Sequence, residues 1–311
     1  MKALVVIIMQ MLFMMGIGLI LRKQRIIDER IQQGLIAILL KVALPLSLLT
    51  SSQTEYSEDM LRALLAVAGA SLIYHAFALA CSSFLTKNIK ADDKEKRIVT
   101  VTSVFGNTGF VGFPIMQALF GGAGLLLAGC FNMIFNLFMY TVGERIISSK
   151  KTNYKELVTN PITLSTIAAL ILFVLPWRMP VIVVDSINLL GDMALPLSMI
   201  IVGSSIATVD IKKLFVDKLS YMAVFLKMIV YPALTIGLVF IVNKFTDVLP
   251  VTMATIAIMS ALPVGSMNVI FAEKHNCAPK LAARTFCLSV VLLPFIIPLV
   301  IAVTYALFIH G

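Results

Sequence analysis

The chain has 311 residues, of which 59% are hydrophobic and only 13% are charged, and its formal net charge is +9. Soluble domains carry roughly 25% charged residues, so no soluble fold could bury this much apolar surface. The composition therefore predicts an all-α polytopic membrane protein and excludes most soluble enzymes. A positive net charge can indicate a nucleic-acid partner in soluble proteins. None is expected here, because the basic residues follow a membrane topology.

Ten apolar segments approach the roughly 20 residues that a helix needs to cross a bilayer core. In chain order the predicted spans are 3–21, 31–50, 61–86, 98–119, 123–145, 160–177, 182–205, 215–243, 250–272 and 281–308. The first segment is interpreted as a retained helix rather than a signal peptide. Arg22, Lys23 and Arg25 follow it, and no clear cleavage site of small residues does. The connections are too short to hold a soluble domain.

The basic residues alternate between the two sides of this predicted topology. The connections after the odd-numbered spans carry most of them: Arg22, Lys23, Arg25, Arg30, Lys87, Lys90, Lys94, Lys96, Arg97, Arg145, Lys150, Lys151, Lys155, Lys212, Lys213, Lys218, Lys274, Lys280 and Arg284. The opposite side carries only Lys2, Arg62, Arg178 and Lys244. The positive-inside rule therefore predicts a multi-pass protein of the cytoplasmic membrane with both termini outside.

A short string repeats within the chain. The sequence Ala43–Ser47 in the second predicted span recurs as Ala194–Ser198 in the seventh, with a proline and a serine in the same register. Five spans separate the two strings, and an odd number of helices per repeat inverts the second copy. Inverted repeats are widespread among secondary transporters. The predicted organisation is a first five-helix repeat at 1–146, a short cytoplasmic linker at 147–159 and an inverted second repeat at 160–311.

Spans four and nine each contain a helix-breaking cluster, Gly106–Pro114 and Ala261–Asn268. Glycine loosens a helix, and proline lacks the amide hydrogen that the helix requires. Unwound backbone survives at membrane depth only beside protein or a water-filled cavity, and matched breaks in two halves indicate a transporter's binding site. New helix N-termini at the breaks would favour an anion. The alternative is that the glycines allow close helix packing and the prolines only kink the helices.

These motifs give the sequence a resemblance to the auxin efflux carrier family, which includes plant auxin exporters and bacterial malate or malonate permease-like proteins. The stretch Gly106–Pro114 resembles the family's helix-four signature. Asn136 followed by Gly143 resembles its helix-five pattern. Ala261–Pro263, followed by Phe271–Glu273, resembles its helix-nine pattern. The resemblance covers the whole chain and is specific to the family rather than to a substrate.

The resemblance implies ten transmembrane helices as two inverted five-helix repeats, with broken helices four and nine crossing between a scaffold and a mobile transport domain. By similarity, Asn107 and Asn136 would hydrogen-bond a substrate carboxylate, while Pro114 and Pro263 would mark the crossing. The short connection 145–160 differs from the long cytoplasmic loop of many plant members and favours the bacterial type.

The candidate substrate-binding residues come from the two breaks and from helix five. The main candidates are Asn107, Thr108, Gly109, Pro114, Asn136, Pro263, Val264, Gly265 and Ser266. The weaker candidates are Ser47, Ser51, Asn132, Ser198 and Asn268. Asn132 and Asn136 share a helix face, where they could face the site or join helices together. The serines are weaker because membrane-helix serines often bond to their own backbone.

Four ionisable residues lie within predicted spans, where such groups are costly and are functional candidates. Lys41 and Asp192 are repeat-equivalent, and one hypothesis is that they approach one another or border the transport pathway. The alternative is that each reaches a nearby polar cavity or the membrane surface. Lys227 could balance substrate charge or hold a polar network between domains. His75 could carry a proton, where some plant members have a carboxylate in helix three.

The predicted function is secondary transport of a small organic anion, with malate or malonate as the leading substrates, by alternating access. An ion/proton antiporter and a carrier or exporter of an aromatic carboxylic acid remain alternatives. No paired intramembrane aspartates and no HExxH or GxSxG motif indicate an enzyme. No cofactor or metal is expected, and the four cysteines are interpreted as core residues. The expected partners are the substrate and the lipid bilayer, with a proton or sodium as coupling ion and a homodimer left open.

Overall fold

The computed structural model describes residues 2–148, 159–175, 178–208, 217–245 and 248–309, and these ranges contain helices and no strand beyond one isolated bridge. Seven of the described helical segments are long and apolar enough to cross a membrane. They are Val5–Lys23, Glu29–Ser51, Glu58–Lys87, Thr108–Ser148, Val181–Ala207, Lys218–Asn243 and Pro279–Ile309. The predicted linker 147–159 lies mostly outside the described residues. The fold is therefore that of a polytopic α-helical membrane protein.

The first half runs α1 (Lys2–Lys23), α2 (Glu29–Ile38), η1 (Leu39–Ala43), α3 (Leu44–Ser51), α4 (Glu58–Lys87), α5 (Asp93–Thr102), η2 (Thr108–Gly112), α6 (Phe113–Phe138), η3 (Met139–Gly143) and α7 (Glu144–Ser148). The second runs α9 (Pro161–Val174), α10 (Val181–Gly191), α11 (Ala194–Ala207), α13 (Lys218–Phe225), η4 (Leu226–Val230), α14 (Tyr231–Asn243), α15 (Pro250–Ser260), α16 (Ser266–Lys274), α17 (Pro279–Thr304) and η5 (Tyr305–Ile309).

The number of long apolar segments is seven rather than the ten predicted, because two predicted spans are merged into one segment and two others are short helices. Gly121 has φ +60° and ψ −146°, so α6 is two helices joined at this residue, and the segment Thr108–Ser148 covers parts of two predicted spans. The helices α9 and α15 are apolar but shorter than a membrane-crossing helix. The helix α15 is short because its predicted span is interrupted at residues 261–265.

Three π-helical turns precede prolines. In each of η1, η2 and η4 the widened turn ends two residues before a proline, which is Pro45, Pro114 or Pro232. The ring of a proline clashes with the carbonyl four residues earlier in a regular helix. The residue before each proline instead bonds five residues back, as Leu44 does to the Leu39 carbonyl. A π-turn of this kind keeps the helix continuous and is frequent at functional sites.

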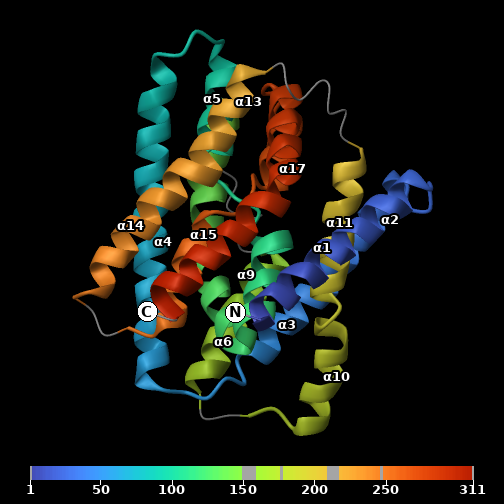
Figure 1. Ribbon diagram of the computed structural model, residues 1–311, viewed down its shortest axis with the longest axis vertical. Helices are drawn as coiled ribbons and strands as arrows, with labels where there is room; N and C mark the ends of the chain where they lie inside the picture. The colour runs from blue at the N-terminus through green and yellow to red at the C-terminus, as the bar shows by residue number, and fades with distance from the viewer. Residues whose placement is uncertain (1, 149–158, 176–177, 209–216, 246–247, 310–311) are drawn as a thin grey trace.

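The helices form two groups (Figure 1). One group contains α1, α2, α3, α10 and α11, in which α1 packs along α11 and α3 packs against α10. The other contains α4, α5, α13, α14, α15 and α17, in which α4 packs on α5 and α13 on α17. The helix α6 contacts both groups, and α9 packs against α3 and α6. The helix α6 therefore lies where the two groups meet.

The connections separate to two ends of the molecule. At one end, the Lys94 Nζ donates to the Asn276 carbonyl at 3.0 Å, which joins the first turn of α5 to the loop before α17. At the other end, Arg178 donates to the Ser52 carbonyl at 3.1 Å. Figure 1 shows the starts of α5, α13 and α17 at the upper end. The start of α5 and the loop before α17, both with basic residues, therefore lie at one end, and the orientation of that end in the membrane stays a prediction.

The helices α1 and α11 approach closely through small residues. A Cβ on Gly18 would overlap the backbone carbonyl of Ile200, and a Cβ on Gly203 would overlap that of Met15. Small residues let membrane helices approach until their backbones touch, which maximises van der Waals contact where lipid removes the usual hydrophobic drive. These two glycines therefore fix the register between the first helix and the α11 segment.

Gly18→Leu should lower the free energy of unfolding by about 1–3 kcal/mol, because the added side chain has no space against α11. Thermal unfolding of the protein in detergent measures the change. Gly16→Leu is the matched control, since nothing lies within 4 Å of a Cβ at this position of the same helix. Equal melting temperatures for the two variants would contradict the close α1–α11 contact.

Candidate functional site

Two unwound segments cross and pair at the centre of the molecule. The helix α5 ends at Thr102 and η2 begins at Thr108, while α15 ends at Ser260 and α16 begins at Ser266. An isolated antiparallel bridge joins Gly106 to Val264 between these breaks. The breaks therefore meet, although they are far apart in the sequence.

Backbone hydrogen bonds hold the crossing together. The Asn107 amide donates to the Pro263 carbonyl at 2.7 Å, and the Gly265 amide donates to the Phe105 carbonyl at 2.9 Å. The Asn268 Nδ2 adds bonds of 2.9 Å to the Phe105 and Gly265 carbonyls. Unsatisfied backbone groups are strongly unfavourable at membrane depth. Each break therefore supplies hydrogen-bond partners for the backbone groups that the other break leaves unpaired.

The crossing has room for no side chain at its two glycines. A Cβ on Gly265 would lie 2.7 Å from the Gly106 oxygen. A Cβ on Gly106 would lie 2.9 Å from the Cε and 3.0 Å from the Nζ of Lys227. Glycine is the residue that permits such close backbone approach. Glycine is therefore needed at positions 106 and 265 because there is no space for a side chain. An unusual φ is not the reason, since only Gly121 among the described glycines has positive φ.

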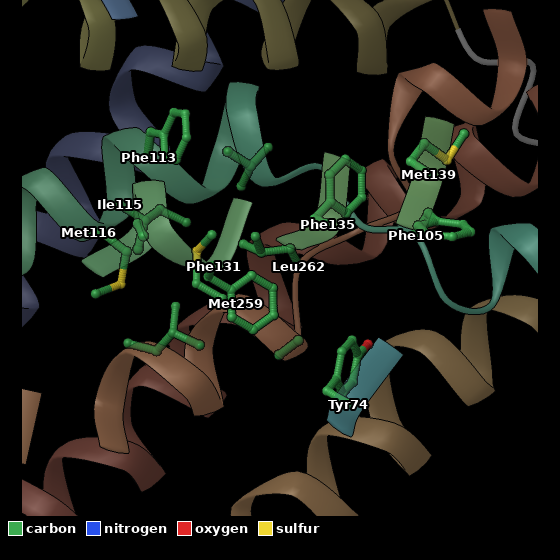
Figure 2. Packing of buried hydrophobic residues seen from close by; sticks show 14 of the residues in the cluster. Tyr74, Phe105, Phe113, Ile115, Met116, Phe131, Phe135, Met139, Met259 and Leu262 are labelled. Carbon is green, nitrogen blue, oxygen red and sulfur yellow. The ribbon is translucent and has the colours of Figure 1, made fainter. Parts of the chain in front are cut away.

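Apolar side chains pack densely beside the crossing (Figure 2). Leu262 and Met259, from the second break and the end of α15, lie near Phe131 of α6. All three side chains are buried. The absence of a side chain at Gly112 makes space for Leu262 and Met259, because a Cβ there would lie 2.7 Å from the Leu262 Cδ1 and 2.9 Å from the Met259 Sδ. The crossing and the packed helices beside it therefore form one close-packed unit.

A cavity of about 110 Å³ opens beside the crossing. Its walls are Leu40, Gly106, Asn107, Thr108, Gly109, Phe110, Asn132, Phe135, Asn136, Tyr140, Asn160, Pro161, Ile162, Gly265, Ser266 and Met267. None of these residues is acidic or basic. Because one water needs about 10–15 Å³ on this measure, the cavity could hold several waters or one small solute. Its polar wall consists of amides and hydroxyls.

Three helical segments begin at this cavity. The η2–α6 segment starts at Thr108, α9 starts at Pro161 and α16 starts at Ser266, and all three residues line the cavity. The first amides of a helix have no partner within it, and its N-terminus carries a partial positive charge. No hydrogen-bond partner is found within the described ranges for the amides of Thr108, Gly109 and Ser266. These groups can donate to an anion.

Two side-chain amides add donors to the cavity. The Asn107 Oδ1 accepts from the Phe110 amide at 3.2 Å, and the Asn132 Oδ1 accepts from the Thr108 hydroxyl at 2.6 Å. An asparagine whose oxygen is engaged still offers the two hydrogens of its Nδ2. Neither Nδ2 has a partner among the residues that the structure describes. Asn136 differs, because its Nδ2 donates to the Thr163 hydroxyl at 2.8 Å and its oxygen is left as the acceptor.

The structure brings most of the main candidates together. The main candidates that line the cavity are Asn107, Thr108, Gly109, Asn136, Gly265 and Ser266, and the weaker candidate Asn132 lines it as well. Pro263 and Val264 belong to the crossing and do not line the cavity. Pro114 lies in the first turn of α6, beyond η2. Asn268 holds the crossing through its two carbonyl bonds.

The serine candidates lie on the opposing helix group rather than in the cavity wall. The Ser47 hydroxyl donates to the Gln117 Oε1 at 3.0 Å. The Ser198 hydroxyl donates to the Phe110 carbonyl, which Pro114 leaves without its usual helical partner. The Ser51 hydroxyl bonds to the Leu48 carbonyl of its own helix at 2.6 Å. Ser47 and Ser198, the two repeat-equivalent serines, therefore both bind the helix that starts at the first break.

Tyr140, Asn160 and Thr163 were not among the site residues predicted from the sequence. The Asn160 Oδ1 accepts from the amides of Ile162 and Thr163 at 3.0 and 3.1 Å, which caps α9. Its Nδ2 donates to the Tyr140 hydroxyl at 3.2 Å. The pair Asn160–Pro161 is a recognisable helix start, with a capping residue before an N1 proline, and could have located this wall. Nothing in the local sequence placed it beside the crossing.

The four ionisable candidates lie outside the cavity wall. His75 is buried, with its Nδ1 2.7 Å from the Ser71 carbonyl. Lys41 and Asp192 are exposed and lie on η1 and at the end of α10, which are in contact. No ion pair between them is found among the described residues. Their joint role remains a prediction.

Among the residues that the structure describes, no group of three or more His, Cys, Asp or Glu side chains could hold a metal ion. Cys81, Cys130, Cys277 and Cys287 are free thiols. Burial raises the pKa of Cys277, which lies in the loop before α17.

Gly265→Ala should lower the free energy of unfolding by about 1–3 kcal/mol, because its Cβ would force the Gly106 carbonyl away and break the backbone pairs of the crossing. Thermal unfolding in detergent measures this loss. Gly237→Ala on α14 is the control, since its Cβ meets nothing within 4 Å and alanine favours the helix. A Gly265→Ala variant as stable as the Gly237→Ala variant would show that the crossing tolerates a side chain.

Comparisons with known proteins agree with this architecture. The chain matches a family model described as "Membrane transport protein" over residues 3–156 and 149–301. It is 29% identical to auxin efflux carrier component 8 of Arabidopsis thaliana over 133 residues, which cover 41% of this chain and 35% of that protein. An uncharacterized transporter of Methanocaldococcus jannaschii is 22% identical over 264 residues, or 81% of this chain and 83% of that protein.

The aligned part of the chain spans about a third of the Arabidopsis protein's length and most of the archaeal transporter. The family model, in contrast, covers almost the whole chain in two consecutive matches. The chain therefore belongs to the auxin efflux carrier family of membrane transport proteins.

Proposed function

We propose that the protein is a secondary transporter that carries a small carboxylate through the cavity at the helix crossing. The observation that carries this proposal is the composition of the cavity wall. The free amides at the starts of η2 and α16 and the Nδ2 groups of Asn107 and Asn132 converge on it, and none of the lining residues is charged. Donors of this kind favour an anion, since helix N-termini carry partial positive charge and accept carboxylates.

The size of the cavity favours a small acid. A volume of about 110 Å³ suits a compact molecule such as malonate or malate better than an aromatic acid. Two carboxylates could be served by separate donors, since the Asn107 side and the Ser266 side of the wall come from different breaks. Malonate and malate are therefore the leading substrates. An aromatic carboxylic acid would require the helix groups to separate.

We propose ten spans in two inverted five-helix repeats, which would make the packing of the helices reciprocal. Under this organisation α1 corresponds to α9, and the segment α2–α3 corresponds to α10–α11. The pair α1 with α11 then has a counterpart in α9 with α3, and both pairs are in contact. The pair α4 with α15 has a counterpart in α13 with α5, and these are also in contact. This reciprocity supports the proposal.

Alternating access would follow from movement of one helix group against the other. The cavity wall takes Leu40 from η1 and residues 160–162 from the start of α9, whereas the crossing supplies the opposite side. A substrate between two such walls is exposed to each side in turn as they rock. The basic connections would face the cytoplasm, with both termini outside. A coupling ion and a homodimer belong to the same proposal, and no residue contact is assigned to either.

Asn107→Asp should weaken malonate and malate binding at least about tenfold while leaving the fold intact. Aspartate caps a helix as well as asparagine does, so the bond from the Phe110 amide is kept. The Nδ2 donor is replaced by a negative oxygen, and hydrogen bonds to charged groups are worth about 1.5–3 kcal/mol. Ligand-induced thermal shifts of the detergent-purified protein measure the affinity, because a ligand of the folded state raises its apparent stability.

Gln33→Glu on the exposed face of α2 is the control for an added negative charge, and it should bind both acids as the unmodified protein does. The screen includes monocarboxylates, an aromatic acid, sodium and pH. Shifts by sodium or pH without any carboxylate shift would favour an ion/proton antiporter. Unchanged carboxylate binding in Asn107→Asp would place the substrate elsewhere.

A further inference from the structure

Lys227 is a fully buried basic residue within a membrane-spanning helix. It lies in the π-helical turn η4 with about 1% of its surface exposed. Its Nζ donates to the Ser260 carbonyl at 2.8 Å and to the Tyr74 hydroxyl at 2.9 Å. The Nζ also lies 5.3 Å from the centre of the Tyr74 ring, a cation–π distance. Three different helices therefore build a compact polar site around one nitrogen.

This site is suited to a cation. Ser260 is the last residue of α15, so its carbonyl belongs to the negative end of a helix dipole. The Tyr74 hydroxyl also donates to the Ser260 carbonyl, at 3.3 Å, which leaves the phenol oxygen facing Lys227. No ion pair of Lys227 with a carboxylate is found in the described part of the chain. The positive charge thus lacks a negative partner, which is costly at membrane depth.

The charge lies directly behind the cavity wall. A Cβ on Gly106 would lie 3.0 Å from the Lys227 Nζ, and Gly106 itself lines the cavity. The nitrogen therefore lies against a glycine of the cavity wall. Electrostatic interactions across such a short, water-poor distance are much stronger than in water. A carboxylate in the cavity would supply the missing negative charge.

We propose that the ammonium of Lys227 is a fixed cation of the transport site, seated on the Ser260 carbonyl and the Tyr74 hydroxyl, which attracts the carboxylate through Gly106. The inference rests on the proposed function. In transporters with interrupted helices, the C-terminal ends of half-helices hold the coupling cation. Here the end of α15 holds the lysine instead. Carboxylate binding therefore requires no sodium.

Two substitutions of Lys227 distinguish the effect of its charge from the effect of its packing. Lys227→Met keeps the length of the side chain and removes its charge. Lys227→Ala removes both and leaves room for a small amine. Malonate and malate affinities are measured by thermal shift for the unmodified protein and both variants, in sodium chloride, potassium chloride and ethylammonium chloride. Lys244→Met, at the exposed end of the same helical segment, is the matched control.

We expect the unmodified protein to bind equally well in sodium and potassium. Both Lys227 variants should bind at least about tenfold more weakly, since each loses an interaction with a charged group. Ethylammonium should restore part of the affinity of Lys227→Ala and none of that of Lys227→Met, whose side chain fills the site. Lys227→Met should melt, without ligand, no lower than the unmodified protein, because an apolar replacement of a buried charge is often neutral or stabilising.

Several outcomes would overturn the inference. Normal carboxylate binding by Lys227→Met, with Asn107→Asp still impaired, would remove Lys227 from the site and leave the proposed function intact. Sodium-dependent binding by the unmodified protein would show that the site needs a free cation. A Lys227→Met variant that no longer folds, together with a folded Lys227→Ala variant that ethylammonium does not rescue, would assign the lysine a structural role. No carboxylate binding by the unmodified protein would reject both proposals.

Discussion

The structure depends on one constraint, which is that unwound backbone inside a membrane must find its hydrogen-bond partners within the protein. Two helices are interrupted, and each interruption exposes carbonyls and amides that lipid cannot satisfy. Asn107 bonds to Pro263 and Gly265 bonds to Phe105, so the two interruptions satisfy each other. The Val264 amide donates a hydrogen bond to the Ser289 hydroxyl at 3.0 Å. Neither break would be stable without the other.

The crossing also places the positive and negative ends of helices on different sides. The helical segments that leave the crossing, η2–α6 and α16, point their N-termini at the cavity. The helix α15 arrives at the crossing with its C-terminus, and the Ser260 carbonyl there meets the buried lysine. The same backbone break thus creates donors for an anion on one side and acceptors for a cation on the other. A cavity without charged walls can therefore lie in a positive field.

The sequence predicted those features of the site that follow from local chemistry. Clusters of glycine, proline and asparagine indicated both breaks, because these residues cannot maintain a regular helix. The contact between the breaks, and the approach of Asn160 to Tyr140, depend on tertiary packing that no local pattern encodes. The equivalence of Lys41 and Asp192, which each lie two residues before the repeated string, likewise carried no information on where their side chains point. The π-turns before Pro45, Pro114 and Pro232 were not predicted, although the proline positions contain that signal.

The distribution of hydrogen bonds indicates which parts can move under the proposed alternating access. The crossing is held by backbone pairs and by Asn268, and separating it would leave several polar groups unsatisfied in lipid. The segment η2–α6–η3, in contrast, is joined to α3, α11 and the start of α9 by a few side-chain bonds at the cavity and beside it. These join Ser47 to Gln117, Ser198 to Phe110, Asn136 to Thr163 and Asn160 to Tyr140.

Side-chain bonds of this kind can be replaced by water or by a substrate carboxylate at little net loss, because each is worth only about 0.5–1.5 kcal/mol. The backbone pairs of the crossing have no such substitute in a close-packed, apolar surrounding. The mobile boundary should therefore run between the crossing and the start of α9, through the cavity itself. Movement along this boundary would carry the donors of the crossing and Lys227 together, so the field on the carboxylate would persist in both states.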